Sequence, residues 1–190
     1  MRRFDFSNKI LLIFALILIA VFIILSLVTF IFFETNQLSQ RTQGKLEGLT
    51  PGKATLEEVK KSLGTPESTK DQKDGKSYYY STESLDYKNI VGFKDNKVKF
   101  TLENIFDLRP LNDYKKEYGS PDLLLYDPHD EVLTWNIFLD DGVGLASVYD
   151  SGVEIVVEIL HFEPQNKESF LEKIASDLGL VSELPPGGEY

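Results

Sequence analysis

The side chains best suited to chemistry in this sequence are its two histidines and several clustered acids. His129 lies in the string YDPHDE, beside Asp127, Asp130 and Glu131. An imidazole among carboxylates is the residue set of a metal site or a proton-transfer site. A tight metal site would need a second imidazole or a spaced set of carboxylates, which the string lacks. We therefore interpret it as a solvated turn between two elements.

Two further places carry suggestive residue types. His161 ends a predicted strand, and we interpret it as structural. Asp140-Asp141-Gly142 could suggest calcium, but the D-x-[DN]-x-[DN]-G spacing of a calcium loop is absent, so we predict a hairpin turn. No nucleophile elbow or phosphate-binding loop is present in the sequence. We predict no catalytic, metal or cofactor-binding residue and expect the protein not to be an enzyme. A hydrolase using two buried acids is the weakest alternative left open.

Composition narrows the function classes further. The chain has 190 residues, a formal net charge of −10 and no cysteine. An acidic surface argues against nucleic acid, because phosphate binding needs basic residues. The absence of cysteine excludes disulfides, thiol nucleophiles and Cys-ligated zinc. Charge is also unevenly distributed, because residues 107–163 hold three basic side chains against thirteen acidic ones.

Aromatic residues mark a candidate protein-contact surface. Tyr78, Tyr79 and Tyr80 are consecutive, and Trp135 lies at the equivalent place in the second half of the chain. Alternation in a strand sends Tyr79 to one face and its two neighbours to the other. One set should belong to the core, and the other could form an exposed binding face. The candidate contact residues are Tyr79, Tyr80 and Trp135, with ordinary sheet packing as the alternative.

The elements that would position these side chains follow one long apolar run. Residues 10–33 contain only Ser26 and Thr29 as polar residues. As a helix they would extend roughly 36 Å, which exceeds the hydrocarbon core of a bilayer. The run is too long for a secretory signal and lacks a small-residue cleavage site. We expect a cytoplasmic segment at 1–9, a transmembrane helix at 10–33 and a stalk at 34–50.

Basic residues before this run set the expected orientation. They predict a single-pass protein of the cell membrane, with a cytoplasmic N-terminus and an extracytoplasmic C-terminal domain. The membrane and a protein of the cell envelope are therefore the expected partners.

The remaining chain matches itself at an offset of 55 residues, so that Gly64 recurs as Gly119. We predict two copies of one unit, at 51–106 and 107–163. In the first, Thr55 and Glu58 have the spacing of a capping box at a helix start.

Turn residues such as Asp95-Asn96 separate the strands that follow each helix, which predicts a three-stranded antiparallel meander per unit. A C-terminal helix is expected at 164–180 and a disordered tail at 181–190. The expected fold is α+β: a transmembrane helix, two tandem helix-plus-meander units and a final helix. Whether the two units share one sheet is left open.

The string TLEEVKKSLGTP, the tyrosine-rich strand after it and the string GFKDNKV resemble two related groups of proteins. These are the SmpA/OmlA-type (BamE-like) outer-membrane-assembly lipoproteins and the wider beta-lactamase-inhibitor-protein-like fold. The residues that carry the resemblance are Thr55, Glu58, Val59, Leu63, Gly64, Pro66, Tyr79, Tyr80, Phe93 and Val98. The resemblance implies a binding module of the envelope or secreted space, and it carries over no catalytic residue.

The sequence thus predicts a membrane-anchored, extracytoplasmic module of the cell envelope that binds or scaffolds another protein without catalysis. The alternative is an inhibitor or ligand-sensing domain that acts on an envelope enzyme. A deep apolar pocket between the two units would favour ligand sensing.

Overall fold

The computed structural model describes residues 46, 48–82, 87–105 and 109–183. The chain divides into two compact units, residues 1–41 and 42–190, and every described residue belongs to the second. The predicted transmembrane segment 10–33 lies outside the described residues. Within the described ranges, no helix is both long enough and apolar enough to cross a membrane. The predicted single-pass membrane localisation is corrected on this finding.

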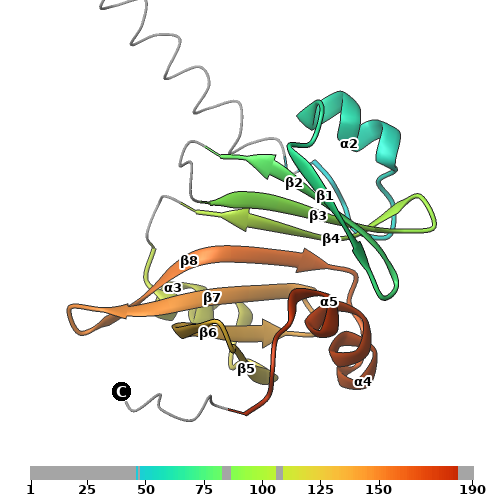
Figure 1. Cartoon of the computed structure of the whole chain (residues 1–190). Coiled ribbons are helices and arrows are strands. Elements are labelled where there is room, and N and C mark those ends of the chain that lie inside the picture. Colours follow the sequence, from blue (N-terminus) through green and yellow to red (C-terminus); the bar gives the residue numbers. More distant parts are fainter. Residues whose placement is uncertain (1–45, 47, 83–86, 106–108, 184–190) are drawn as a thin grey trace, which may run out of the picture. The chain divides into compact units, whose positions relative to one another are not determined.

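Eight antiparallel strands form one continuous sheet, in the order β1-β2-β3-β4-β8-β7-β6-β5 (Figure 1). Each half of the sequence contributes four consecutive strands, and the two halves join where β4 pairs with β8. The strands are β1 (Ser68–Gln72), β2 (Gly75–Ser81), β3 (Lys88–Lys94), β4 (Lys97–Asn104), β5 (Leu123–Asp127), β6 (Asp130–Phe138), β7 (Val143–Asp150) and β8 (Val153–Phe162).

The predicted fold of two helix-plus-three-stranded units, with the inhibitor-protein-like architecture, is therefore wrong. Each half has four strands, and all eight share one sheet. The missed strands are β1 and β5, which form the two edges of the sheet. β1 reads STKDQ, and four of its five side chains are exposed. Such a strand has no apolar alternation, which is the signal that a sequence pattern offers.

Two short helices precede the two halves of the sheet, as the sequence predicts. α2 (Leu56–Leu63) begins with the expected capping box, in which the Thr55 N–H donates to Glu58 Oε2 at 2.7 Å. α3 (Leu111–Tyr118) follows Pro110 and has no side-chain cap. Both helices end at a glycine with positive φ, Gly64 at 82° and Gly119 at 83°.

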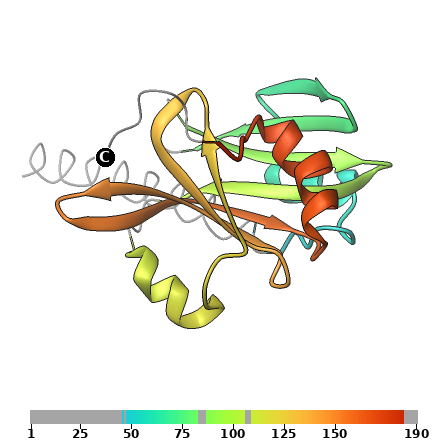
Figure 2. The ribbon, with the colours of Figure 1, turned by 90° about the horizontal axis from the view of Figure 1, so that it is seen from below.

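Helices cover both faces of the sheet. α2 and α3 lie on the same face, called here the α3 face. On this face α2 packs on Val91, Phe93 and Val98, and α3 packs on Leu145 and Val156. A C-terminal helix runs through α4 (Lys167–Phe170), the π-helical η1 (Leu171–Ala175) and α5 (Ser176–Leu178). It covers the other face, called the α4 face, and Figure 2 shows it across the sheet from α3.

The core of the α4 face combines residues from both halves. Its buried members include Phe100 and Leu102 from β4, Trp135 from β6, Leu160 from β8 and Phe170 from the C-terminal helix. Because each half alone would expose this surface, the hydrophobic effect favours the joined sheet.

A bulge in β4 ties the C-terminal helix to the sheet. Phe93 pairs with Val98 and Gly92 pairs with Phe100, so Lys99 is an extra residue in the strand. Lys99 Nζ lies 2.8 Å from Asp177 Oδ2, and the two side chains are only 8% and 4% exposed. This buried ion pair fixes α5 over the first half of the sheet.

Candidate functional site

The residues singled out for chemistry do not come together. His129 lies in the exposed turn between β5 and β6, where its backbone N–H donates to Asp127 Oδ1 at 2.8 Å. His161 lies on β8, between Thr101 and Val143. The predicted turn at Asp140–Gly142 is confirmed, and Gly142 has a φ of 66°. Across the described ranges, no group of three or more acids and histidines is placed to hold a metal ion.

The aromatic residues follow the predicted alternation. Tyr80 belongs to the core under α2, and Tyr78 packs edge-on against Phe93 with ring centroids 5.0 Å apart. Burial raises the pKa of Tyr80 to about 12. Trp135 is 2% exposed and Tyr80 is 6% exposed, so neither offers accessible area to a protein partner. Tyr79, on the opposite face from Tyr80, is half-buried.

An apolar groove remains uncovered on the α3 face of the second half. α3 packs over the end of this face that holds Phe138, Val143 and Leu145. The other end is a hollow of about 790 Å³, called here the apolar groove. It is lined by Asn112, Val132, Thr134, Ser147, Tyr149, Gly152, Val153 and Glu154.

The groove carries large apolar side chains in contact with solvent. Tyr149 is 67% exposed, Val132 is 56% exposed and Val153 is 43% exposed. Leu124, on the edge strand β5, is 49% exposed as well, whereas its neighbours Leu123 and Leu125 pack into the core of the α4 face. Clustered exposed apolar residues of this kind mark interaction surfaces in soluble domains.

The surroundings of the groove are acidic. Glu154 lines it, with Lys115 Nζ 3.8 Å from its Oε2, and Asp150 is exposed on the same hairpin. The half of the chain that builds the groove, residues 107–163, has three basic side chains against thirteen acidic ones. The groove therefore combines exposed apolar side chains with a negative field.

A second hollow, called here the central crevice, lies on the α4 face where the two halves meet. It has a volume of about 270 Å³ and is lined by residues of both halves and of the C-terminal segment. The lining comprises Tyr79, Tyr87, Lys88, Ile90, Leu102, Asn104, Asp127, Trp135, Glu158, Leu178 and Leu180. Tyr79 and Trp135, which the sequence selected as contact residues, thus meet in one hollow.

The strand register brings residues of both halves to this crevice. Trp135 pairs with Ala146, Ala146 pairs with Glu158, and Glu158 pairs with Asn104, so these residues form one row across four strands. Ala146 is fully buried in the core of the α4 face, and the other three residues of the row line the crevice.

Glu158 has an unusual environment in this row. Burial raises the pKa of its carboxyl to about 7, and the negative charges of Asp127 and Asp130 add to the rise. Among the described residues, no side chain makes a hydrogen bond or ion pair with this carboxyl. The Trp135 Nε1 is also buried and has no hydrogen-bond partner in the described part of the chain. Pattern reasoning missed Glu158, because only the strand register brings it to Trp135.

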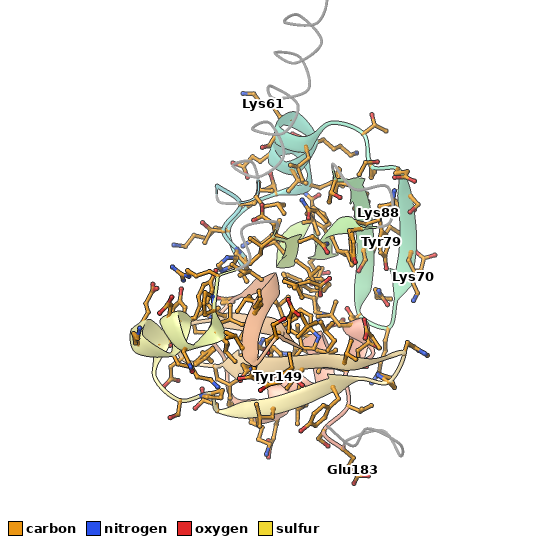
Figure 3. All side chains as sticks on the ribbon, turned by 90° about the vertical axis from the view of Figure 1, so that its left-hand side faces the viewer. Lys61, Lys70, Tyr79, Lys88, Tyr149 and Glu183 are labelled. Atoms are coloured by element: carbon orange, nitrogen blue, oxygen red, sulfur yellow. The ribbon has the colours of Figure 1, made fainter. Side chains whose placement is uncertain are left out.

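Lys88 stands at the rim of the crevice next to Tyr79 (Figure 3). Its ammonium group is already paired with Glu67 Oε2 on the other side of the strand β2. It therefore does not neutralise Glu158. Tyr149 of the apolar groove, on β7, is labelled in the same figure.

No family model matches the chain, and no curated protein matches it. The predicted membership of the SmpA/OmlA-type and inhibitor-protein-like groups is wrong, because all eight strands form one antiparallel sheet and not two helix-plus-meander units. One solved structure is similar, that of an extracellular protein containing a SCP domain from Bacillus anthracis. It shares 12% identity at a TM-score of 0.45, over 76% of this chain, and the chain spans about half the length of that protein.

Proposed function

We propose that this protein is a non-catalytic binding module that docks another protein through the apolar groove. The observation that carries the proposal is the exposure of Val132, Tyr149 and Val153 in one concave surface. Aromatic and aliphatic anchors in a desolvated hollow supply most of the binding energy of protein interfaces. Thr134, half-buried on the floor, offers a hydrogen bond that fixes the orientation of a partner.

The occupant is a basic, amphipathic segment of a different protein. The groove lies in the half of the chain with a net charge of −10, and Glu154 and Asp150 stand beside it. Opposite charge steers association and raises its rate, whereas like charges facing each other oppose it. A second copy of this acidic chain is therefore a poor occupant.

Photo-crosslinking tests the proposal at the groove itself. A benzoylphenylalanine replaces Tyr149 in one variant and Lys70, which is exposed on the edge strand β1, in a control. We expect a crosslink from position 149 and not from position 70, to a segment rich in basic and apolar residues. Because exposed charges are screened by salt, crosslinking should weaken as the ionic strength rises.

Three results would contradict the proposal. One is equal crosslinking from both positions, and another is an acidic target segment. The third is a crosslink to a second copy of this chain, with a dimer in light scattering that a Val132→Thr/Tyr149→Ser variant abolishes.

A further inference from the structure

The central crevice has the features of a ligand site, and it lies on the opposite face of the sheet from the apolar groove. Thr134 lines the groove and the next residue, Trp135, lines the crevice. Successive residues of a strand point to opposite faces. An inference about the crevice is therefore independent of the proposed docking function.

Two polar groups in the crevice have no protein partner among the described residues. The Trp135 indole N–H is 98% buried with its residue and donates to nothing in that part of the chain. The Glu158 carboxyl is half-buried and accepts from no described side chain. A buried donor that stays unpaired is costly, and a half-buried carboxyl in the same hollow is open to a ligand.

We propose that the central crevice binds a small organic cation: a primary ammonium group with a hydrogen-bond acceptor close to it. The ammonium group pairs with Glu158, and Asp127 adds a second negative charge to the lining. The acceptor atom of the ligand takes the Trp135 N–H. Lys88 does not compete, because Glu67 already holds its ammonium group.

The aromatic and apolar walls fit the same ligand. Tyr79 and Trp135 line the crevice, and the faces of such rings attract cations. Ile90, Leu102 and Leu180 supply apolar contact for carbon atoms. A volume of about 270 Å³ lies just under the usual range for drug-sized ligands, so the occupant is a small amine or one lysine side chain.

The single tryptophan of the chain makes the test direct. Trp135 is the only tryptophan, so one indole N–H resonance and one fluorescence signal report on the crevice. The full chain is titrated with ethanolamine and, separately, with acetyl-lysinamide. The neutral controls are ethylene glycol and acetyl-norleucinamide. We expect a saturable shift of the indole resonance with at least one cation and none with its neutral control.

The titrations with ethanolamine and with acetyl-lysinamide distinguish the two possible sources of the ammonium group. Binding of ethanolamine alone identifies a free small amine, and binding of acetyl-lysinamide alone identifies a lysine side chain of a protein. Binding of both supports the ammonium site common to them. Failure of both cations to bind, or equal binding of the neutral controls, would overturn the proposal.

Variants check that the signal comes from the named groups. Glu158→Gln keeps the shape and removes the charge, and it should weaken binding about tenfold or more. Tyr79→Leu removes an aromatic wall of the crevice and should also weaken binding. Glu154→Gln, on the same strand but in the apolar groove, is the matched control and should bind as the wild type does. Unchanged affinity in both Glu158→Gln and Tyr79→Leu would refute the assignment.

Discussion

At the scale of single residues, the fold places the carboxyl of Glu158 where its charged form is disfavoured. It lies between Ala146 and Asn104 in the middle of the sheet, half-buried beside the core of the α4 face. A carboxyl without a cation or hydrogen-bond donor is disfavoured in its charged form. Carboxyl groups with a raised pKa in a hollow are common in ligand-binding sites.

This environment predicts a pH-dependent stability. The pKa of Glu158 is raised from 4.5 to about 7 in the folded protein. Its contribution to the unfolding free energy is therefore fully present below pH 4.5 and is lost as the pH rises to 7. Between these pH values the carboxyl ionises freely in the unfolded chain but stays largely protonated in the folded one. A pKa shift of this size corresponds to at most about 3 kcal/mol of unfolding free energy, and partial solvent access to the carboxyl reduces this to about 1–2 kcal/mol.

Glu158→Gln tests this prediction, because glutamine cannot ionise. Relative to the wild type, the variant should gain about 1–2 kcal/mol of unfolding free energy between pH 4.5 and pH 8. Urea denaturation at the two pH values measures the difference. A stability difference that stays constant over this range would show that the carboxyl titrates normally.

At the scale of elements, a buried ion pair ties the C-terminal helix to the β4 bulge. Lys99 in the β4 bulge and Asp177 in α5 are nearly inaccessible and 2.8 Å apart. Asp74 Oδ2 is farther from the same ammonium group, at 3.9 Å, and pairs with Lys94 at 2.6 Å. Removing one partner of a buried pair leaves an uncompensated charge, whereas replacing both can be nearly neutral.

Asp177→Ala should therefore lower the unfolding free energy by about 3 kcal/mol, and Lys99→Met/Asp177→Leu should recover most of that loss. Denaturant titration of the two variants and the wild type measures both values. The exposed pair Lys116–Asp113 provides the control, and Asp113→Ala should change stability little. An equal loss of unfolding free energy in the single and the double variant would contradict this role of the ion pair.

Sequence patterns predicted local structure better than they predicted how the halves combine. The capping box at Thr55 and the opposite faces of Tyr79 and Tyr80 depend on residues near each other in the chain, and both are confirmed. The polar edge strand β1 gave no periodic signal. The β4–β8 pairing, and with it the crevice beside Glu158, joins residues more than 50 positions apart, which no local pattern encodes.

At the scale of the whole described domain, the two halves share one core. Phe100 from the first half and Leu160 from the second are both fully buried in it. The domain should therefore unfold in one cooperative step, because separating the halves would expose this surface to water.

Native-state hydrogen exchange checks this cooperativity. Backbone amides at the centres of β3 and β7, which lie in different halves, should exchange with the same opening free energy. A markedly lower value for one half would mean that it opens while the other stays folded. Phe100→Ala should lower both values together, because its ring contacts the shared core.

The affinity for the segment crosslinked at position 149 tests the central claim most directly. Val132→Thr/Tyr149→Ser removes two exposed apolar anchors of the groove, and Lys70→Ser removes an exposed side chain on the edge strand β1. The account predicts that the double variant binds a peptide of that segment about tenfold more weakly or worse, while Lys70→Ser binds it as the wild type does. An unchanged affinity in the double variant, with its folding intact, would contradict the proposed function.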